Sequence, residues 1–242
     1  MQLGILQCDL VRPEWRSKFG DYPDMFQRLL TIADATLTFR VYDLTNGEFP
    51  DTLDECDAWL FTGSKWSVND TDTWIRRAEA LAVRLHQERR PTIGICFGHQ
   101  LIARALGGRV EKATGVGWGV GVHTTRVIDQ QAWMMPAADE IALVVSHQDQ
   151  VVELPASATL LASHPFCPCD MYQVNEHILT FQGHPEFPKG YSHATMDQRR
   201  ERIGEPTYQR GVESLAISTD EAVAAEWIVC FLRASANTAH LE

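Results

Sequence analysis

Cys96 is the residue of this sequence whose surroundings best suit a nucleophile. It lies in the heptapeptide GICFGHQ at 94–100, directly after the apolar run PTI at 91–93. This pattern predicts a buried strand, a sharp turn that carries the cysteine and a helix from 98 to 106, which together form a nucleophile elbow. The start of a helix also favours a reactive thiolate. The alternative is a core cysteine between a strand and a helix, because free cysteines are often buried.

A histidine and a glutamate later in the chain can complete a catalytic set with this cysteine. They belong to QGHPE at 182–186, which follows the strand-like run ILTF at 178–181. A thiol nucleophile needs a base that later protonates the leaving amine, and histidine does both near neutral pH. We expect His184 to be this base and Glu186 to fix its tautomer, since Pro185 restricts the backbone between them.

A second histidine, His147, competes for the role of the base. Asp149 follows it at the same spacing that separates Glu186 from His184. We rank His184 first because His147 lacks a glutamate in a His-x-Glu arrangement. The spacing of Asp149 nevertheless keeps the alternative open.

The cysteine elbow and the His-Pro-Glu segment together resemble the sites of class I (triad) glutamine amidotransferases. The resemblance extends over residues 3–187 and includes SHQDQV at 146–151. Within the family, the sequence is most similar to stand-alone γ-glutamyl peptidase-like members, which share GEFP at 47–50 in similar form. It departs from many relatives at 62–65, where TGSK stands in place of SGGP. The family fold that this resemblance implies is a single α/β domain.

This resemblance also implies an oxyanion hole and a glutamyl-binding loop. The oxyanion donors are expected to be the backbone N–H groups of Phe97 and Ser64, with Gly63 allowing the turn. A side-chain amide at Gln100, one helical turn after Cys96, is placed to contact the glutamyl group. The residues expected to bind substrate are Gln100, His147, Gln148 and Asp149.

These features predict a cysteine hydrolase that cleaves a γ-glutamyl amide bond through a glutamyl-thioester. Its substrate is glutamine or a γ-glutamyl peptide or amine. The alternative is a glutaminase subunit that delivers ammonia to a separate synthetase. A purely binding role is disfavoured because every position of the catalytic set is filled. The expected partners are a small-molecule γ-glutamyl substrate and either a synthetase or further copies in a homo-oligomer, and no metal or organic cofactor is needed.

Composition and charge argue against several other classes of protein. The 242 residues carry a formal net charge of −11, which disfavours nucleic acid and anionic membranes as partners. No apolar stretch approaches the roughly 20 residues that span a bilayer, and the N-terminus lacks a signal-peptide pattern. The six cysteines are not needed as disulfides in a chain of this size, so a reducing, cytoplasmic compartment is expected. The CPC sequence at 167–169 lacks a second ligand pair, so we expect no metal site there.

Strands alternate with helical segments, which predicts one α/β domain over 1–235 with a mostly parallel central sheet and helices on both faces. The last helix is marked by STDE at 218–221, a capping-box pattern. We expect a disordered tail at 236–242. The predicted strands are 3–7, 38–42, 58–61, 92–95, 120–127, 141–145, 151–153, 159–162, 169–174 and 178–182. The predicted helices are 23–34, 72–88, 98–106 and 219–233.

The segment 189–215 differs in character from the rest of the chain. It is rich in arginine and glutamate and contains several glycines and a proline. One interpretation is a solvated surface helix with loops. The other is a lid or a partner-facing insertion, because a segment that begins three residues after Glu186 must start beside the site.

Overall fold

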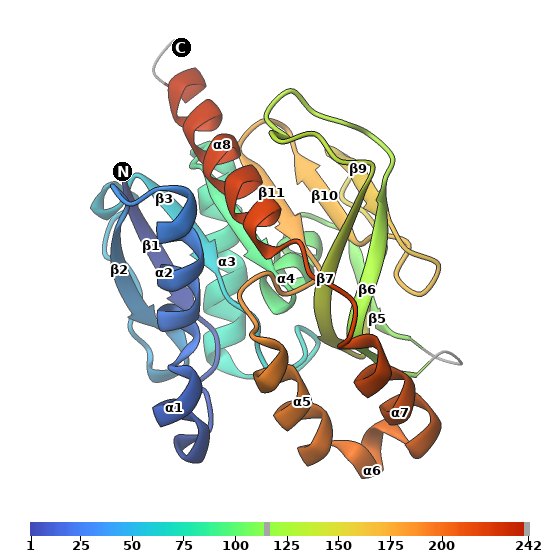
Figure 1. Ribbon diagram of the computed structural model, residues 1–242. Coiled ribbons are helices and arrows are strands. Elements are labelled where there is room, and N and C mark those ends of the chain that lie inside the picture. Colours follow the sequence, from blue (N-terminus) through green and yellow to red (C-terminus); the bar gives the residue numbers. More distant parts are fainter. Residues whose placement is uncertain (114–116, 240–242) are drawn as a thin grey trace.

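The computed structural model describes residues 1–113 and 117–239, and its centre is one nine-stranded sheet (Figure 1). The strands lie in the order β2-β1-β3-β4-β11-β10-β9-β6-β7, and a separate two-stranded sheet joins β5 to β8. The strands are β1 (Gln2–Gln7), β2 (Thr38–Asp43), β3 (Ala58–Phe61), β4 (Thr92–Ile95), β5 (Arg109–Lys112), β6 (Gly119–Val127), β7 (Glu140–His147), β8 (Asp149–Glu153), β9 (Ala158–Ser163), β10 (Met171–Val174) and β11 (Ile178–Phe181). The helices are α1 (Pro13–Phe19), α2 (Tyr22–Ala33), α3 (Thr73–Gln87), α4 (Phe97–Ala105), α5 (Lys189–Gln198), α6 (Arg200–Ile203), α7 (Glu205–Ser214) and α8 (Glu221–Ala239).

The large sheet is mixed. The first five strands in the spatial order, from β2 to β11, run parallel to one another. Beyond β11, each strand up to β7 pairs antiparallel with the one before it. Parallel neighbours need crossover connections, whereas the tight turn at 175–177 allows β10 and β11 to pair antiparallel. The predicted fold class is confirmed: the chain is an α/β domain whose elbow strand, β4, lies within the parallel part.

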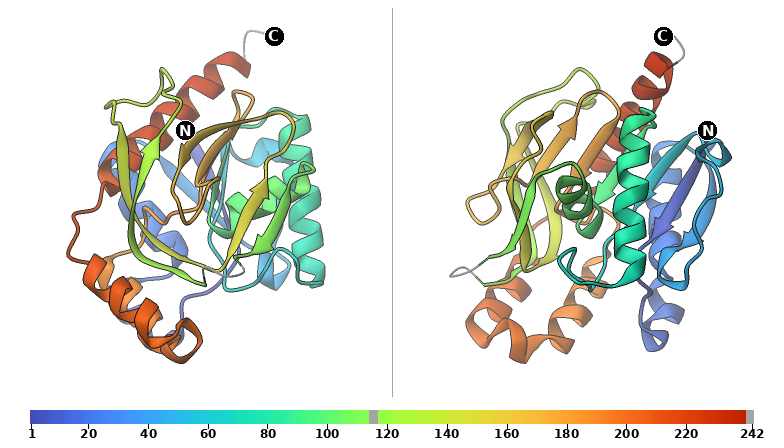
Figure 2. Two further views of the ribbon diagram at one scale, coloured as in Figure 1. Left: turned by 90° about the vertical axis from the view of Figure 1, so that its right-hand side faces the viewer. Right: turned by 180° about the vertical axis from the view of Figure 1, so that it is seen from behind.

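Helices cover both faces of this sheet. On one face α2 packs against α8, and on the other α3 packs against α4 (Figures 1 and 2). Each face has its own apolar core: Phe26 and Trp227 are buried on the α2–α8 side, Trp59 and Leu85 on the α3–α4 side. The periodic apolar residues of these helices face the sheet, which explains why their periodicity predicts them.

The carboxyl ends of four parallel strands meet at one edge of the sheet. β1 ends at Gln7, β3 at Phe61, β4 at Ile95 and β11 at Phe181, and the strand pairing places these ends next to one another. The segments that leave these strands therefore converge, as is typical of the ligand-binding edge of a parallel sheet. Helices α5, α6 and α7 gather at this end of the molecule (Figure 1).

The structure differs from the predicted elements in places where the sequence has no clear periodicity. Neither α1 nor β5 is predicted, because each buries only one residue, Phe19 in α1 and Val110 in β5, and so has no hydrophobic pattern. The segment 189–215 contains three helices, which break at Arg199 and Gly204. Helix α8 continues to Ala239, beyond its predicted end at 233 and into the range expected to be a tail. The rest of that tail, 240–242, lies outside the described residues.

Candidate active site

Cys96 forms the turn between β4 and α4. Its φ of +50° lies in the left-handed region, which is costly for a residue with a side chain and is typical of functional turns. The neighbouring glycines allow close packing: a Cβ on Gly94 would lie 2.9 Å from the carbonyl of Gly98, and a Cβ on Gly98 would lie 2.6 Å from the carbonyl oxygen of Phe61. The predicted elbow is therefore present, and its helix begins at Phe97, one residue earlier than predicted.

His184 and Glu186 form a buried pair next to this turn. Nδ1 of His184 lies 2.8 Å from Oε1 of Glu186, and both side chains are almost fully inaccessible. The backbone N–H of His184 donates to the carbonyl of Val144 over 2.7 Å, which ties the segment after β11 to β7. A Cβ on Gly63 would lie 2.7 Å from His184 Cε1 and 3.7 Å from Cys96 Cβ. The structure thus brings together the three residues that the sequence indicates as a catalytic set.

The pKa of His184 is raised to about 10. Burial alone would lower this pKa, but the carboxylate of Glu186 and the sulfur of Cys96 favour the imidazolium and outweigh burial. Near neutral pH, His184 is therefore an imidazolium, which can protonate a leaving amine. Burial instead lowers the pKa of His147 to about 3, so that imidazole is neutral over the same range.

Glu186→Gln should make the stability of the protein depend less on pH between about 6.5 and 10. A histidine whose pKa is raised stabilises the folded state fully below the unfolded value of 6.5, and this stabilisation is lost as pH rises towards about 10. The free energy of unfolding of the unchanged protein should therefore fall, relative to that of the variant, across this range. Urea unfolding at a series of pH values measures the difference, and exposed Glu226→Gln is the matched control. If the free energy of unfolding of the unchanged protein rose with pH relative to that of Glu186→Gln, this account of His184 would be contradicted.

An aromatic cluster restrains the imidazole of His184. The ring of Phe187 is stacked on it, with centroids 3.8 Å apart and planes 10° from parallel. Tyr191 packs edge-on against Phe187 with a centroid distance of 4.7 Å, and the ring of Tyr22 lies 5.9 Å from Phe187. Because Glu186 holds one edge of the imidazole and Phe187 covers one face, its orientation is set by packing as well as by hydrogen bonding.

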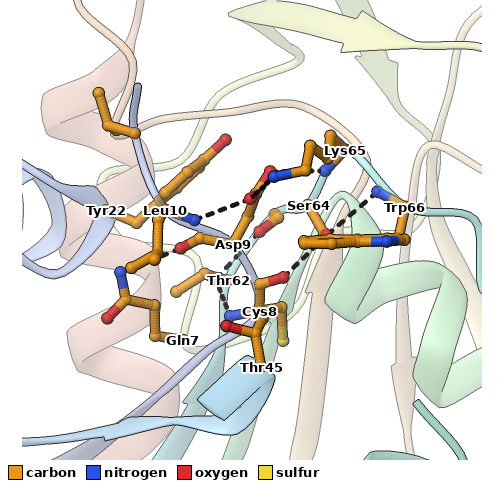
Figure 3. A network of polar contacts seen from close by, with 12 residues as sticks. Gln7, Cys8, Asp9, Leu10, Tyr22, Thr45, Thr62, Ser64, Lys65 and Trp66 are labelled. Atoms are coloured by element: carbon orange, nitrogen blue, oxygen red, sulfur yellow. Dashed lines mark hydrogen bonds and ion pairs between the residues drawn. The ribbon is translucent and has the colours of Figure 1, made fainter. Parts of the chain in front are cut away.

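A network of polar contacts from the end of β1 shapes the turn that follows β3 (Figure 3). The hydroxyl of Ser64 donates to the carbonyl of Cys8 over 2.8 Å, and the N–H of Cys8 donates to Thr62 Oγ1 over 2.9 Å. The buried carboxylate of Asp9 accepts from the backbone N–H and from the ammonium group of Lys65, at 2.9 and 2.8 Å. This network fixes the backbone of the turn, as a preorganised set of N–H donors requires.

Two backbone N–H groups near Cys96 have no hydrogen-bond partner among the residues that the structure describes. They belong to Ser64, in the turn after β3, and to Phe97, the first residue of α4. The first N–H groups of a helix lack acceptors within it, and the network described above uses the N–H of Lys65 but not that of Ser64. Gly63 lies against both the cysteine and the histidine, so this turn borders the nucleophile. The geometry is compatible with the oxyanion hole expected from the sequence.

Gly63→Ala should lower kcat/KM by about 100-fold or more, because the new methyl group would displace the imidazole of His184. Its Cβ would lie only 2.7 Å from Cε1 of that ring. Steady-state kinetics, together with thermal unfolding to verify folding, measure the effect. Gly190→Ala is the matched control, since its Cβ would come no closer than 3.4 Å to Phe19 and activity should be unchanged. Full activity in Gly63→Ala would show that the imidazole is not needed where the structure places it.

A cavity of about 230 Å³ opens beside Cys96. A smaller pocket contains His184 and shares Ser64 with the cavity, so the cysteine and the histidine border adjoining spaces. The cavity is lined by all four residues that the sequence analysis expects to bind substrate: Gln100, His147, Gln148 and Asp149.

Gln100 and His147 are both tied to the start of β8. Nε2 of Gln100 donates to the carbonyl of Asp149 over 2.8 Å and to Oε1 of Gln182 over 3.0 Å. Nδ1 of His147 lies 3.1 Å from the same Asp149 carbonyl. The structure therefore pairs His184, and not His147, with a carboxylate side chain.

Two further residues with titratable side chains, His99 and Cys167, are buried in the core. His99 is fully buried and contacts Thr180 Oγ1 at 2.9 Å, and burial lowers its pKa to about 3. Cys167 is also buried, which raises the pKa of its thiol. Over 1–113 and 117–239, no cluster of three or more metal-ligating side chains could hold a metal ion. Over the same ranges, no helix has the length and apolar character needed to cross a membrane.

Several residues that line the cavity belong to no motif that would predict their place in the site from sequence. Arg199 and Arg202 reach it from the segment 189–215, which therefore borders the cavity rather than lying apart on the surface. The only hint of this is the start of the segment just after Glu186. The cavity residues that the sequence analysis does not identify include Lys65, Lys112, Trp118, Arg199 and Arg202.

Comparison with known proteins identifies the family of this chain. The family model for glutamine amidotransferase class-I matches residues 32–199. The chain is 30% identical over 184 residues to gamma-glutamyl peptidase 3 of Arabidopsis thaliana, and the match covers 72% of each protein. It is 31% identical over 144 residues to one of the subunits of the glutamine-hydrolyzing GMP synthase of Sulfolobus acidocaldarius, covering 59% of this chain and 74% of that protein. The crystal structure of a glutamine amidotransferase from Methylobacillus flagellatus has a TM-score of 0.75 at 19% identity, covering 98% of this chain and 94% of that one, and so shares the fold.

The chain belongs to the class I glutamine amidotransferase family. The matched range includes both the elbow cysteine and the His184–Glu186 pair. Its relatives that are named gamma-glutamyl peptidase identify it further as an enzyme of the amidohydrolase type.

Proposed function

We propose that this enzyme hydrolyses γ-glutamyl amide bonds through a thioester on Cys96. The observation that carries the proposal is the position of Cys96 at a strained turn, beside the buried His184–Glu186 pair and on the wall of a polar cavity. A nucleophile, an acid–base group and its orienting carboxylate in this order are the parts that acyl transfer needs. The similarity to gamma-glutamyl peptidases supports the substrate class.

In the first half of the reaction, the thiolate of Cys96 attacks the γ-carbonyl carbon of the substrate. The N–H groups of Ser64 and Phe97 stabilise the negative charge that develops on the carbonyl oxygen. The C–N bond then breaks while the imidazolium of His184 gives its proton to the leaving nitrogen. The products of this half are the free amine and a glutamyl-thioester on the enzyme.

In the second half, His184 acts as a base towards water. Once Cys96 is part of a thioester it carries no charge, so one of the two groups that raise the pKa of His184 no longer does so. The neutral imidazole can then accept a proton from the water that attacks the thioester. The C–S bond then breaks, which releases glutamate and returns Cys96 to the thiolate, while the proton taken from water stays on His184. Glu186 stabilises the imidazolium whenever it forms.

We also propose that the enzyme works in a reducing compartment such as the cytoplasm. All six cysteines are free thiols in the structure. A cysteine nucleophile must stay reduced to act, and reducing compartments maintain free thiols.

The purified chain alone should hydrolyse a γ-glutamyl dipeptide with a kcat/KM at least about 10-fold above that for free glutamine. The cavity of about 230 Å³ beside Cys96 is also bordered by Arg199 and Trp118, which offers contacts to a leaving group larger than ammonia. Glutamate release from glutamine, glutathione, γ-glutamyl dipeptides and γ-glutamyl amines measures the preference, with the Cys96→Ala protein as the blank. If none of these compounds is cleaved, the proposed activity is wrong.

A glutaminase subunit that serves a separate synthetase is the second candidate. The similarity to one of the subunits of a glutamine-hydrolyzing GMP synthase favours it. In that case glutamine would be the best substrate in the same panel, and its turnover would rise sharply when a co-purifying synthetase is added. That combination of results would replace the peptidase proposal.

A further inference from the structure

The cavity beside Cys96 has a basic lining although the whole chain carries a net charge of −11. Four basic side chains line it against two acidic ones. A concave site with an excess of one sign of charge favours ligands of the opposite sign. The basic residues are Lys65, Lys112, Arg199 and Arg202, and the acidic ones are Asp70 and Asp149.

Arg199 and Arg202 have no carboxylate partner within the described ranges 1–113 and 117–239. Their neighbours differ in this respect. Arg200, which lies between them, forms an ion pair with Glu205 at 2.6 Å, and Lys65 is paired with Asp9 at 2.8 Å. Guanidinium groups that line a cavity without a carboxylate partner keep their charge available to an anionic ligand.

Arg199 is held in place by neutral groups. Its Nη1 donates to the hydroxyl of Ser146 over 3.1 Å. The carbon at the centre of its guanidinium lies 5.6 Å from the centroid of the Trp118 ring, and that of Arg202 lies 5.5 Å from the same ring. Contact with an aromatic ring orients a guanidinium while leaving N–H donors at its edge for a planar acceptor.

The position of Arg199 relative to His184 indicates which part of a substrate it meets. His184 gives its proton to the leaving nitrogen, so the leaving group lies on the His184 side of the bond that breaks. Arg199 lines both the cavity that contains Cys96 and the pocket that contains His184. A group attached to the leaving nitrogen is therefore within the space that this arginine borders.

We propose that Arg199, supported by Arg202, binds a carboxylate on the leaving group and so selects γ-glutamyl derivatives of amino acids or peptides over γ-glutamyl amines. This inference rests on the proposed hydrolysis of γ-glutamyl amides. Arginine suits the role because its planar donors match the two oxygens of a carboxylate. Trp118 contributes by presenting a ring on which both guanidinium groups rest.

The experiment compares two nearly isosteric substrates, γ-glutamylglycine and γ-glutamylglycinamide, which differ only in the charge at the far end of the leaving group. The unchanged enzyme should cleave the acid with a kcat/KM about 10-fold or more above that of the amide. Arg199→Gln should lower kcat/KM for the acid by about 10- to 100-fold, mainly through KM, and leave the value for the amide within about 2-fold. Arg199→Lys should recover part of the preference, since it keeps the charge but loses the planar donors.

The control is Arg210→Gln, which removes an exposed guanidinium on α7 that does not line the cavity beside Cys96, and it should leave both substrates unaffected. Thermal unfolding verifies that each variant is folded. An equal loss for both substrates in Arg199→Gln would overturn the proposal, because the arginine would then act on the glutamyl part. An unchanged enzyme that cleaves both compounds equally well would overturn it too. Cleavage of neither compound would instead refute the proposed hydrolase activity on which it rests.

Discussion

Cys96→Ala should abolish hydrolysis of γ-glutamyl substrates, with a loss in kcat of at least about 10⁴-fold. Without the sulfur, no thioester can form. The free energy of unfolding should change by no more than about 1 kcal/mol, since only one heavy atom is removed and both residues experience the same strained φ of +50°. Steady-state assays and urea unfolding of the purified variant measure these two quantities.

The matched control for this variant is Cys230→Ala. This cysteine is half-buried on α8, away from the elbow, and its replacement should leave turnover unchanged. Retained turnover in the Cys96→Ala protein would remove this cysteine from the mechanism.

His184→Ala should lower kcat by about 10³-fold or more, because the leaving amine and the attacking water both lose their proton-transfer partner. Glu186→Gln should lower kcat less than His184→Ala does, since the imidazole remains. Its orientation is then less well fixed, and its imidazolium form is less stabilised. His147→Ala should mainly raise KM, because His147 lines the cavity and burial lowers the pKa of its imidazole to about 3, which makes it a weak base near neutral pH. Single-turnover rates and steady-state parameters of the three variants, each verified by thermal unfolding, measure these effects.

The competing assignment makes the opposite prediction. If His147 were the base, His147→Ala would be as inactive as Cys96→Ala, while His184→Ala would turn over at a nearly normal rate. That pattern would refute the roles given to His184 and Glu186.

The part of the fold that surrounds the elbow could be predicted from sequence because local patterns are strong there. The apolar strand β4 and the glycines beside Cys96 predict their elements within a few residues. The STDE sequence at 218–221 also predicts a helix there, although α8 begins at Glu221 rather than at 219. Helices α5 and α7 contain glycine or proline in their first turns, and α6 has only four residues. Contacts with the sheet stabilise α5 and α7, and α6 packs against those two helices, so the local sequence is a weak guide to this segment.

One part of the site could also be predicted from sequence, and another part could not. Cys96, His184 and Glu186 lie in short motifs whose residue types and spacing indicate their chemistry, and the structure brings them together. The basic lining of the cavity has no such motif. Arg199 reaches it through the break between α5 and α6, and Trp118 precedes β6, far away in the sequence. Only the folded chain shows that these two residues meet.

Trapping of the covalent intermediate tests the central claim most directly. The enzyme is mixed rapidly with a γ-glutamyl dipeptide, quenched in acid within one turnover and digested, and its peptides are analysed by mass spectrometry. We expect the peptide that contains Cys96 to gain the mass of one glutamyl group, the gain to disappear as glutamate is released, and the peptides of the other five cysteines to remain unmodified. Efficient turnover with no adduct on Cys96 at any time, or a glutamyl adduct that forms and decays at catalytic rates on another residue, would contradict the account.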